Sequence, residues 1–499
     1  MKALRPPMGW NSWDSYMTTI TEEDVLANAR FMSDNLKQFG WDTIVVDASW
    51  FDPQAKSEAY NDAAQGATFC LDKYGRLLPD PVRFPSAADG SGFTHIAEKV
   101  HELGLKFGFH VMRGIPRQAV RENCPVEGTQ WTARDVADMD PEHACHWNND
   151  NYGLNQAHPG AQAWYNAQLD LYASWGIDFL KVDDMQAPFY PAEIEAYSQA
   201  IRIAEHKYHR EISLSLSPGT QVATTNIDFL RRNAQMWRIS DDLWDRWRDV
   251  YNQFSRMARW APLQTPGHWA DADMLPLGHL TVNDKQGGHM SNLTPAEQRT
   301  LLTLWAMSHS PLMMGGDLPT SSAETIELLK NPWLLEVEAN STHNREVLRE
   351  IYDQENKFNK WDGASVPEGE FIVWAAYATG AAPSSCSCEK GEKCSCGSGE
   401  ACSCGSGEAC SCGENSALTT ERGSYYTACF WTGPTQCQQR VDIAAIVGLE
   451  DYQLGFDLTR WKVTDLWSGT SGEAKLDGRL LSVTMPAHGC VWLRFDPID

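Results

Sequence analysis

Short apolar runs alternate with segments of helical character along the first part of the chain. Runs such as Thr43–Ala48 are almost continuously apolar, which is typical of strands buried on both faces of a parallel sheet. The segments between them carry helix start signals, because Thr21 precedes the acidic run Glu22–Asp24 and prolines stand at Pro159 and Pro295. The predicted strands are Met8–Trp10, Thr43–Ala48, Lys106–Met112, Phe179–Asp183, Ile212–Ser217, Met236–Ser240, Gly267–Asp271 and Pro311–Met314.

Eight strands that alternate with helices predict an α/β fold, a (β/α)8 TIM barrel, over residues 1–325. A doubly wound sheet is the alternative, but it usually has fewer strands, and no Gly-rich phosphate loop follows the first strand. Over residues 335–499 the pattern changes to short strands bounded by Gly, Asp and Ser turns, such as "KVTDLWSG". This pattern predicts a C-terminal antiparallel β-sandwich domain.

A repeat of C-S-C with a period of eight residues interrupts the predicted sandwich at 383–416. Its Gly, Ser, Glu and Cys residues cannot form a packed core, so we expect a disordered excursion from one loop. Paired thiols could bind soft metals such as Zn²⁺ or Cu⁺, and the alternative is an accessory expansion without a metal. We expect free thiols at the six remaining cysteines, Cys70, Cys124, Cys145, Cys429, Cys437 and Cys490.

The charge balance excludes one class of partner. The chain has 41 basic and 66 acidic residues, a formal net charge of -25, which argues against nucleic acid binding. Neither a run of 18 apolar residues nor a signal-peptide core is visible, so we expect a cytoplasmic protein that does not bind membranes. The 21 Trp and 15 Tyr residues suit a ligand with flat apolar faces, such as a sugar, but also suit a large core.

Candidate chemistry lies at the carboxyl ends of the predicted strands, where barrels build their active sites. In "FLKVDDM" the residues Lys181 and Asp183 share one face of the strand, whereas Asp184 belongs to the other. A neighbouring ammonium lowers the pKa of a carboxyl group, and an ionised carboxylate can act as a nucleophile. An inward salt bridge that holds the barrel mouth is the alternative, and this strand alone does not decide between them.

A second inward carboxylate comes from the sixth strand, where Arg238 and Asp242 share a face. Two carboxyl groups on either side of a cleft are the requirement for glycoside hydrolysis. Asp47 also points inward, as do Asp271 and Asp273 on the seventh strand. These acids form a sugar-type pocket together with the indoles of Trp10, Trp13, Trp50 and Trp269.

The same acids could instead bind Mg²⁺ or Ca²⁺. Lys181 and Arg238 argue against that alternative, because they would bring positive charge into a metal cage. We therefore predict no metal at the main site and no cofactor. The predicted partner is an oligosaccharide or glycoside substrate, and a homo-oligomeric state is left open.

Five segments resemble, in the right order, the motifs of glycoside hydrolase family 27, the α-galactosidase (melibiase) family. They are "PPMGWNSWDSY", "FLKVDDM", "WRISDDLWD", "WADADML" and "LWAMSHSPLMMGGDL", so the resemblance covers nearly the whole chain. It implies a retaining mechanism through a covalent glycosyl-enzyme, with Asp183 as the nucleophile and Asp242 as the acid/base. It further implies sugar contacts from Asp47, Lys181, Arg238 and Asp273.

The departures from the family pattern fall on specificity. The second strand ends Asp47-Ala48-Ser49-Trp50, where the family has D-D-C-W and uses the carboxylate pair to hold O4 and O6 of galactose. His110 replaces a common tyrosine, and either binds sugar or has a structural hydrogen-bonding role. Strand five offers small residues near the sugar 2-position in place of a Glu and bulky aromatics. The predicted substrate-binding set is Trp10, Asp47, Trp50, His110, Lys181, Ser215, Ser217, Arg238 and Asp273.

The sequence therefore predicts a retaining exo-acting glycosidase, with α-galactosidase as the first expectation. The alternatives are the same mechanism on another sugar, as in an α-N-acetylgalactosaminidase, a β-L-arabinopyranosidase or an isomalto-dextranase. A sugar-binding or metal-binding protein without catalysis is the less favoured reading, because Asp183 and Asp242 are both present.

Overall fold

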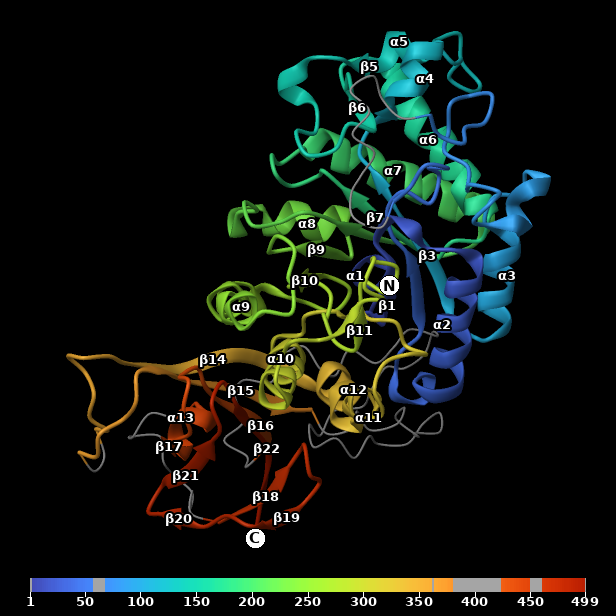
Figure 1. The fold of residues 1–499 in the computed structure, drawn as a ribbon. Helices are drawn as coiled ribbons and strands as arrows, with labels where there is room; N and C mark the ends of the chain where they lie inside the picture. Colours follow the sequence, from blue (N-terminus) through green and yellow to red (C-terminus); the bar gives the residue numbers. More distant parts are fainter. Residues whose placement is uncertain (1, 57–67, 361–362, 380–422, 449–459, 499) are drawn as a thin grey trace, which may run out of the picture.

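The computed structural model describes residues 2–56, 68–360, 363–379, 423–448 and 460–498. A barrel with surrounding helices forms the upper part of the molecule in Figure 1, and a second domain of β-strands lies beneath it. The predicted disordered repeat at 383–416 lies outside the described residues.

Eight parallel strands form one sheet in the order β10-β9-β8-β7-β3-β2-β1-β13. The backbone N–H of Leu275, beyond β10, donates to the carbonyl of Met313 at 2.8 Å and ties β13 back to the other end of the sheet. The fold is thus the predicted TIM-like barrel, and all eight predicted strands are confirmed. Their bounds are β1 (Met8–Asn11), β2 (Thr43–Val46), β3 (Lys106–Met112), β7 (Phe179–Asp183), β8 (Ser213–Leu216), β9 (Met236–Arg238), β10 (Trp269–Asp271) and β13 (Leu312–Met314).

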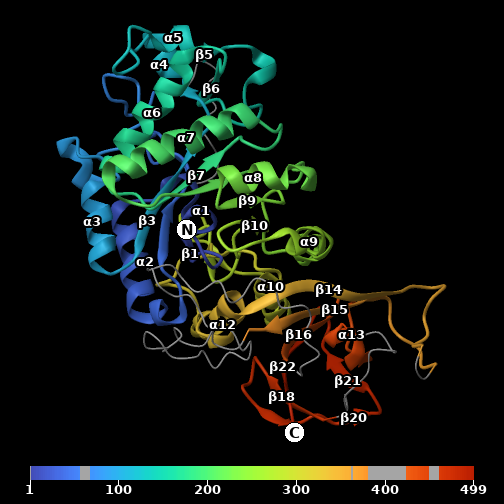
Figure 2. The ribbon, with the colours of Figure 1, turned by 180° about the vertical axis from the view of Figure 1, so that it is seen from behind.

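Helices surround the strands on the outside, as α2 and α3 do beside β2 and β3 in Figure 2. Side-chain caps fix where two of them begin. Thr21 forms a capping box with Asp24 before α2, and Thr294 forms one with Glu297 before α10. The helices are α1 (Trp13–Tyr16), α2 (Glu22–Asn35), α3 (Thr94–Glu102), α4 (Arg117–Glu122), α5 (Ala133–Val136), α6 (Pro159–Ser174), α7 (Pro191–Tyr208), α8 (Ile227–Asn233), α9 (Trp247–Trp260), α10 (Pro295–Ser308), α11 (Ala323–Leu329) and α12 (Pro332–Asn340).

The loops at the carboxyl ends of the barrel strands contain short β-ribbons. Their strands are β4 (Ile115–Pro116), β5 (Ala137–Asp138), β6 (Asn151–Leu154), β11 (His279–Leu280) and β12 (His289–Met290).

The register of the barrel strands decides which side chains face the interior. Lys181 of β7 is aligned with His110 of β3 on one side and with Ser215 of β8 on the other. Because side chains alternate along a strand, the flanking residues Leu180 and Val182 face outward, where they are fully buried in the main hydrophobic core. The polar residues of three neighbouring strands therefore meet inside the barrel.

The C-terminal domain is an antiparallel sandwich, as predicted. A six-stranded sheet in the order β14-β15-β16-β22-β18-β19 packs on a three-stranded sheet in the order β17-β21-β20. The strands are β14 (Ser341–Tyr352), β15 (Gly369–Ala378), β16 (Ser424–Trp431), β17 (Cys437–Asp442), β18 (Trp461–Asp465), β19 (Ser471–Glu473), β20 (Leu476–Asp477), β21 (Leu480–Met485) and β22 (Cys490–Pro497), with helix α13 (Ile443–Val447) after β17.

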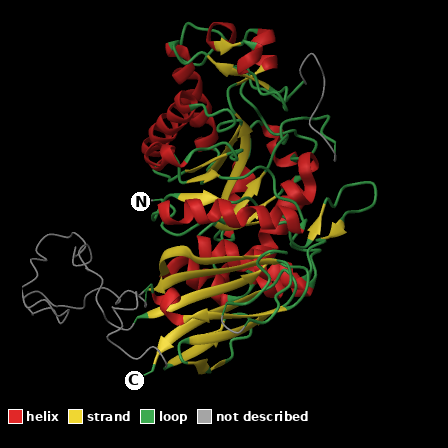
Figure 3. Ribbon diagram, turned by 90° about the vertical axis from the view of Figure 1, so that its left-hand side faces the viewer, coloured by secondary structure: helices red, strands yellow, loops and turns green. Residues whose placement is uncertain are grey.

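The two domains share one hydrophobic core. Helices lie between the barrel and the larger sheet of the sandwich (Figure 3). Trp374, Phe430 and Trp492 of the sandwich are fully buried in the same apolar cluster as the barrel residues. The rings of Phe254 on α9 and Phe430 on β16 meet edge to face, 5.1 Å apart. The sandwich is therefore part of the support of the barrel.

We expect Phe430→Ala to lower the free energy of unfolding by about 3–5 kcal/mol, because it removes a fully buried ring and leaves a cavity between the domains. Phe358→Ala is the matched control, since Phe358 is 55% exposed and its loss should cost less than about 0.5 kcal/mol. Urea denaturation followed by tryptophan fluorescence measures both. Equal effects of the two substitutions would contradict a shared core.

Candidate active site

Asp183 ends strand β7 and points to the interior of the barrel. Its Oδ2 lies 3.2 Å from Nε2 of His110, and its Oδ1 accepts a hydrogen bond from the backbone N–H of Asp184 at 2.9 Å. Burial alone would raise the pKa of Asp183, but the hydrogen bond from His110 and the charges of His110 and Lys181 outweigh it and hold this pKa below its usual value. Asp183 is thus an ionised carboxylate, as a nucleophile has to be.

Lys181 and Asp47 form an ion pair next to this carboxylate. Nζ of Lys181 lies 2.7 Å from Oδ2 of Asp47, and Nδ2 of Asn11 donates to the same oxygen at 2.8 Å. The other oxygen of Asp47 accepts the backbone N–H of Ala48 at 2.8 Å. Burial opposes the charge of Asp47, but Lys181 outweighs it and keeps the pKa of Asp47 well below its usual value. The inward salt bridge that the sequence left open is present, but it joins Lys181 to Asp47 and leaves Asp183 with His110.

Arg238 organises the opposite side of the site. Its Nη1 lies 2.8 Å from Oδ1 of Asp273, and its Nη2 donates to Oδ1 of Asp242 at 3.3 Å. Burial and the charges of Asp242 and Asp271 raise the pKa of Asp273, although Arg238 opposes the shift. The Asp242 side chain is 60% exposed, compared with 14% for Asp183. Asp242 therefore stands on the side of the site that solvent can reach.

The structure brings seven predicted site residues besides Asp183 and Asp242 to the carboxyl ends of the barrel strands. These are Asp47, His110, Lys181, Ser215, Ser217, Arg238 and Asp273. His110 is only 1% exposed and contacts Asp183, which supports its structural hydrogen-bonding role over direct sugar contact. The buried Oγ of Ser217 has no hydrogen-bond partner within the described ranges.

Two predicted sugar contacts are wrong. Trp10 is fully buried, and its Nε1 donates to the carbonyl of Gly316 at 3.0 Å. Trp50 is also fully buried, and it packs among aromatic rings in the main core while its Nε1 donates to the carbonyl of His110 at 2.7 Å. Neither indole can stack on a sugar, because neither has an exposed face. Trp13 instead belongs to the apolar cluster inside the barrel, which also contains Ala48.

Sequence reasoning missed two residues of the site, Asn11 and Asp14. Asn11 is two residues beyond Gly9 on the inward face of β1, so strand parity could have found it. Asp14 lies on the short helix α1, where no strand pattern applies. Its carboxyl group is buried against Gly315, where an added Cβ would lie 2.1 Å from Oδ2, so only glycine fits there. Burial and the charges of Asp273 and Asp242 raise the pKa of Asp14 well above its usual value.

The structure contains free thiols at Cys70, Cys124, Cys145, Cys429, Cys437 and Cys490, as predicted. Within the described residues, no group of three or more His, Cys, Asp or Glu side chains is arranged to hold a metal ion. In the same part of the chain, none of the helices has the length and apolarity needed to cross a membrane.

Comparison with known proteins gives two family matches. The family described as "Alpha galactosidase A" matches residues 150–340, and the one described as "Alpha galactosidase C-terminal beta sandwich domain" matches residues 424–495. Among curated relatives, α-galactosidase 3 of Arabidopsis thaliana is 27% identical over 341 residues, which span 67% of this chain and 60% of that protein. Human α-N-acetylgalactosaminidase is 25% identical over 373 residues, 70% of this chain and 74% of that protein.

A solved structure is similar over its full length. It is a GH27 β-L-arabinopyranosidase from Geobacillus stearothermophilus, 35% identical, with a TM-score of 0.79 and coverage of 99% of this chain and 97% of that chain. The barrel, the sandwich and the carboxylates at the barrel mouth define the class of glycosidases. Within that class, the chain belongs to glycoside hydrolase family 27.

We expect Lys181→Met to lower the free energy of unfolding by about 3–5 kcal/mol, because it leaves the buried carboxylate of Asp47 without its counter-charge. Lys207→Met is the control. It breaks an exposed ion pair with Asp170, whose side chains are 56% and 40% exposed, and should cost about 0–1 kcal/mol. Urea denaturation compares the two, and a small effect at Lys181 would show that Asp47 does not depend on this ion pair.

Proposed function

We propose that the protein is an exo-acting glycosidase that hydrolyses glycosides with retention of the anomeric configuration. The observation that carries the proposal is the environment of Asp183, an inward carboxylate that His110 and Lys181 keep ionised at the end of a barrel strand. Asp242 supplies the second carboxyl group from the next-but-one strand end. Membership of family 27 supports the same assignment.

The reaction takes two steps. In the first, the carboxylate of Asp183 forms a bond to the anomeric carbon while Asp242, as its acid, protonates the departing glycosidic oxygen. In the second, Asp242 takes a proton from water, whose oxygen attacks the anomeric carbon and releases Asp183. The exposure of Asp242 suits this work, because the leaving group departs and water arrives on the solvent side.

Ala48 indicates which sugar the site accepts. The family resemblance places a second carboxylate at this position, where the pair holds O4 and O6 of galactose. Here the position holds a methyl group that is 2% exposed and packs with Trp13 inside the barrel. β-L-Arabinopyranosides share the ring configuration of α-D-galactosides but lack the C6 hydroxymethyl group, so they do not need a partner for O6. We propose β-L-arabinopyranosides as preferred substrates and α-D-galactosides as the second class.

This substrate agrees with that of the similar Geobacillus stearothermophilus enzyme, a β-L-arabinopyranosidase. Ser215 on β8 and Ser217 just after it are small, which keeps α-N-acetylgalactosaminides as a further class to test.

A 2-fluoro glycosyl fluoride should label Asp183 covalently. The 2-fluorine slows both formation and hydrolysis of the glycosyl-enzyme, but the fluoride leaving group keeps formation fast enough for the intermediate to accumulate. Peptide mass spectrometry locates the adduct, and Asp183→Asn should remain folded but lose nearly all turnover. NMR of the first-formed sugar should show the anomeric configuration of the substrate. An adduct on another carboxylate, or an inverted product, would contradict the mechanism.

Among p-nitrophenyl glycosides, we expect kcat/KM for the β-L-arabinopyranoside to exceed that for the α-D-galactoside by about tenfold or more, since the site offers no carboxylate for O6. Ala48→Asp should shift this ratio toward the galactoside by about tenfold, and Ala48→Ser is the control for size without charge. A wild-type enzyme that prefers the galactoside would restore α-galactosidase as the first assignment.

A further inference from the structure

Arg113 is a buried cation next to the site, and no sequence motif singled it out. It follows strand β3, and its side chain is 3% exposed. Its Nη2 donates to Oδ2 of Asp184 at 2.7 Å, and its Nε donates to Oδ2 and to the backbone carbonyl of Asp184 at 3.1 and 3.0 Å. One guanidinium thus holds both the side chain and the main chain of Asp184.

The backbone of Asp184 has an unusual conformation. Its φ of 59° lies in the left-handed region, which costs a residue with a Cβ on the order of 1 kcal/mol. Burial raises the pKa of Asp184 to about 6 while Arg113 opposes the shift. The other oxygen, Oδ1, is buried without a hydrogen-bond partner in the described residues, so Arg113 is what compensates this carboxylate.

The conformation of Asp184 reaches Asp183 through the main chain. In the left-handed turn the N–H of Asp184 points back and donates to Oδ1 of Asp183 at 2.9 Å. The N–H of Arg113 donates to the carbonyl of Asp183 at 3.0 Å. His110 holds the other carboxylate oxygen. The orientation of the Asp183 carboxylate therefore depends on the turn that Arg113 clamps.

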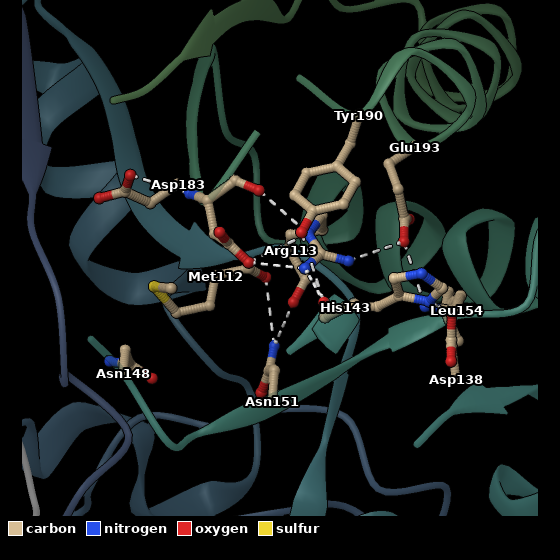
Figure 4. A network of polar contacts seen from close by, with 12 residues as sticks. Met112, Arg113, Asp138, His143, Asn148, Asn151, Leu154, Asp183, Tyr190 and Glu193 are labelled. Atoms are coloured by element: carbon tan, nitrogen blue, oxygen red, sulfur yellow. Dashed lines mark hydrogen bonds and ion pairs between the residues drawn. The ribbon is translucent and has the colours of Figure 1, made fainter. Parts of the chain in front are cut away.

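Further contacts fix the guanidinium itself. Nη1 donates to Oε1 of Glu193 at 3.2 Å, Nη2 donates to the carbonyl of His143 at 2.8 Å, and the plane stacks on the ring of Tyr190 at 3.8 Å (Figure 4). His143 lies in the loop between β5 and β6, whereas Tyr190 and Glu193 lie at the start of helix α7. The guanidinium of Arg113 is thus held in place by groups outside the barrel wall.

We propose that Arg113 and Asp184 form a positioning pair that fixes the attack geometry of Asp183. The proposal rests on the proposed function, because it takes Asp183 to be the nucleophile. Neither residue touches the sugar. They act by holding a left-handed turn whose N–H orients one carboxylate oxygen, so their loss should slow formation of the glycosyl-enzyme while sugar binding is preserved.

The test compares Asp184→Ala with Asp184→Asn in the full-length enzyme. Asparagine tolerates the left-handed conformation and keeps an oxygen that accepts from Arg113, whereas alanine does neither. The measured quantity is the rate constant for trapping by a 2-fluoro glycosyl fluoride. The fraction of protein that becomes labelled, read by mass spectrometry, gives the number of active sites to which this rate is normalised. We expect Asp184→Ala to lower it by about tenfold to a hundredfold with less than about a threefold change in KM. Asp184→Asn should stay within about threefold of the wild type.

Arg117→Met is the matched control, because Arg117 also lies on this rim and its side chain bonds to Asn151 and stacks on Tyr152 instead of contacting Asp184. It should leave the trapping rate per site unchanged, and Arg113→Met should resemble Asp184→Ala. If Asp184→Ala lowers only the melting temperature and the number of active sites, the pair is purely structural and the proposal is overturned. A wild-type enzyme that traps no sugar overturns the proposed function, and the positioning role with it.

Discussion

Charge pairing inside the barrel is the constraint on which the site depends. The parallel strands bring several carboxylates to one end of the barrel, most of them buried, where an unpaired charge would be costly. Three cations contact most of these acids: Lys181 contacts Asp47, Arg238 contacts Asp273 and Asp242, and Arg113 contacts Asp184 outside the barrel wall. Asp183 differs from these acids, because the side chain that contacts its carboxylate is a histidine, His110. Neither Lys181 nor Arg238 forms a direct ion pair with it: Nε2 of His110 contacts one carboxylate oxygen and the N–H of Asp184 donates to the other.

The strand pattern could predict the fold and most of the site, because both follow from a period of two along buried strands. Lys181 and Asp183 face inward and Asp184 faces outward, as parity requires. The same rule, applied to Trp10, would have placed that indole outside the barrel with Ile44 and Met314, which are its aligned neighbours and belong to the outer core. The error came from choosing an indole by its type without its parity.

Other features could not be predicted from local pattern. Arg113 and Asp14 lie just beyond regular strands, where parity ends and the direction of a side chain depends on the turn. The partners of Arg113 come from positions as far along the chain as Glu193, so no spacing signals the network. Whether Lys181 would pair with Asp47 or with Asp183 likewise depended on the distances between three strands, and only the folded barrel sets these.

The neighbouring residues Asp183 and Asp184 of "FLKVDDM" are of one type but have different roles. The carboxylate of Asp183 lies inside the barrel, where hydrogen bonds and a nearby ammonium favour its charge. That of Asp184 lies outside, where burial raises its pKa to about 6 and a guanidinium opposes the shift. The strand ends at Asp183, the left-handed backbone of Asp184 turns the chain there, and the N–H of Asp184 donates to Oδ1 of Asp183. Asp184, whose carboxylate lies outside the barrel, therefore affects the carboxylate of Asp183 through a single main-chain hydrogen bond.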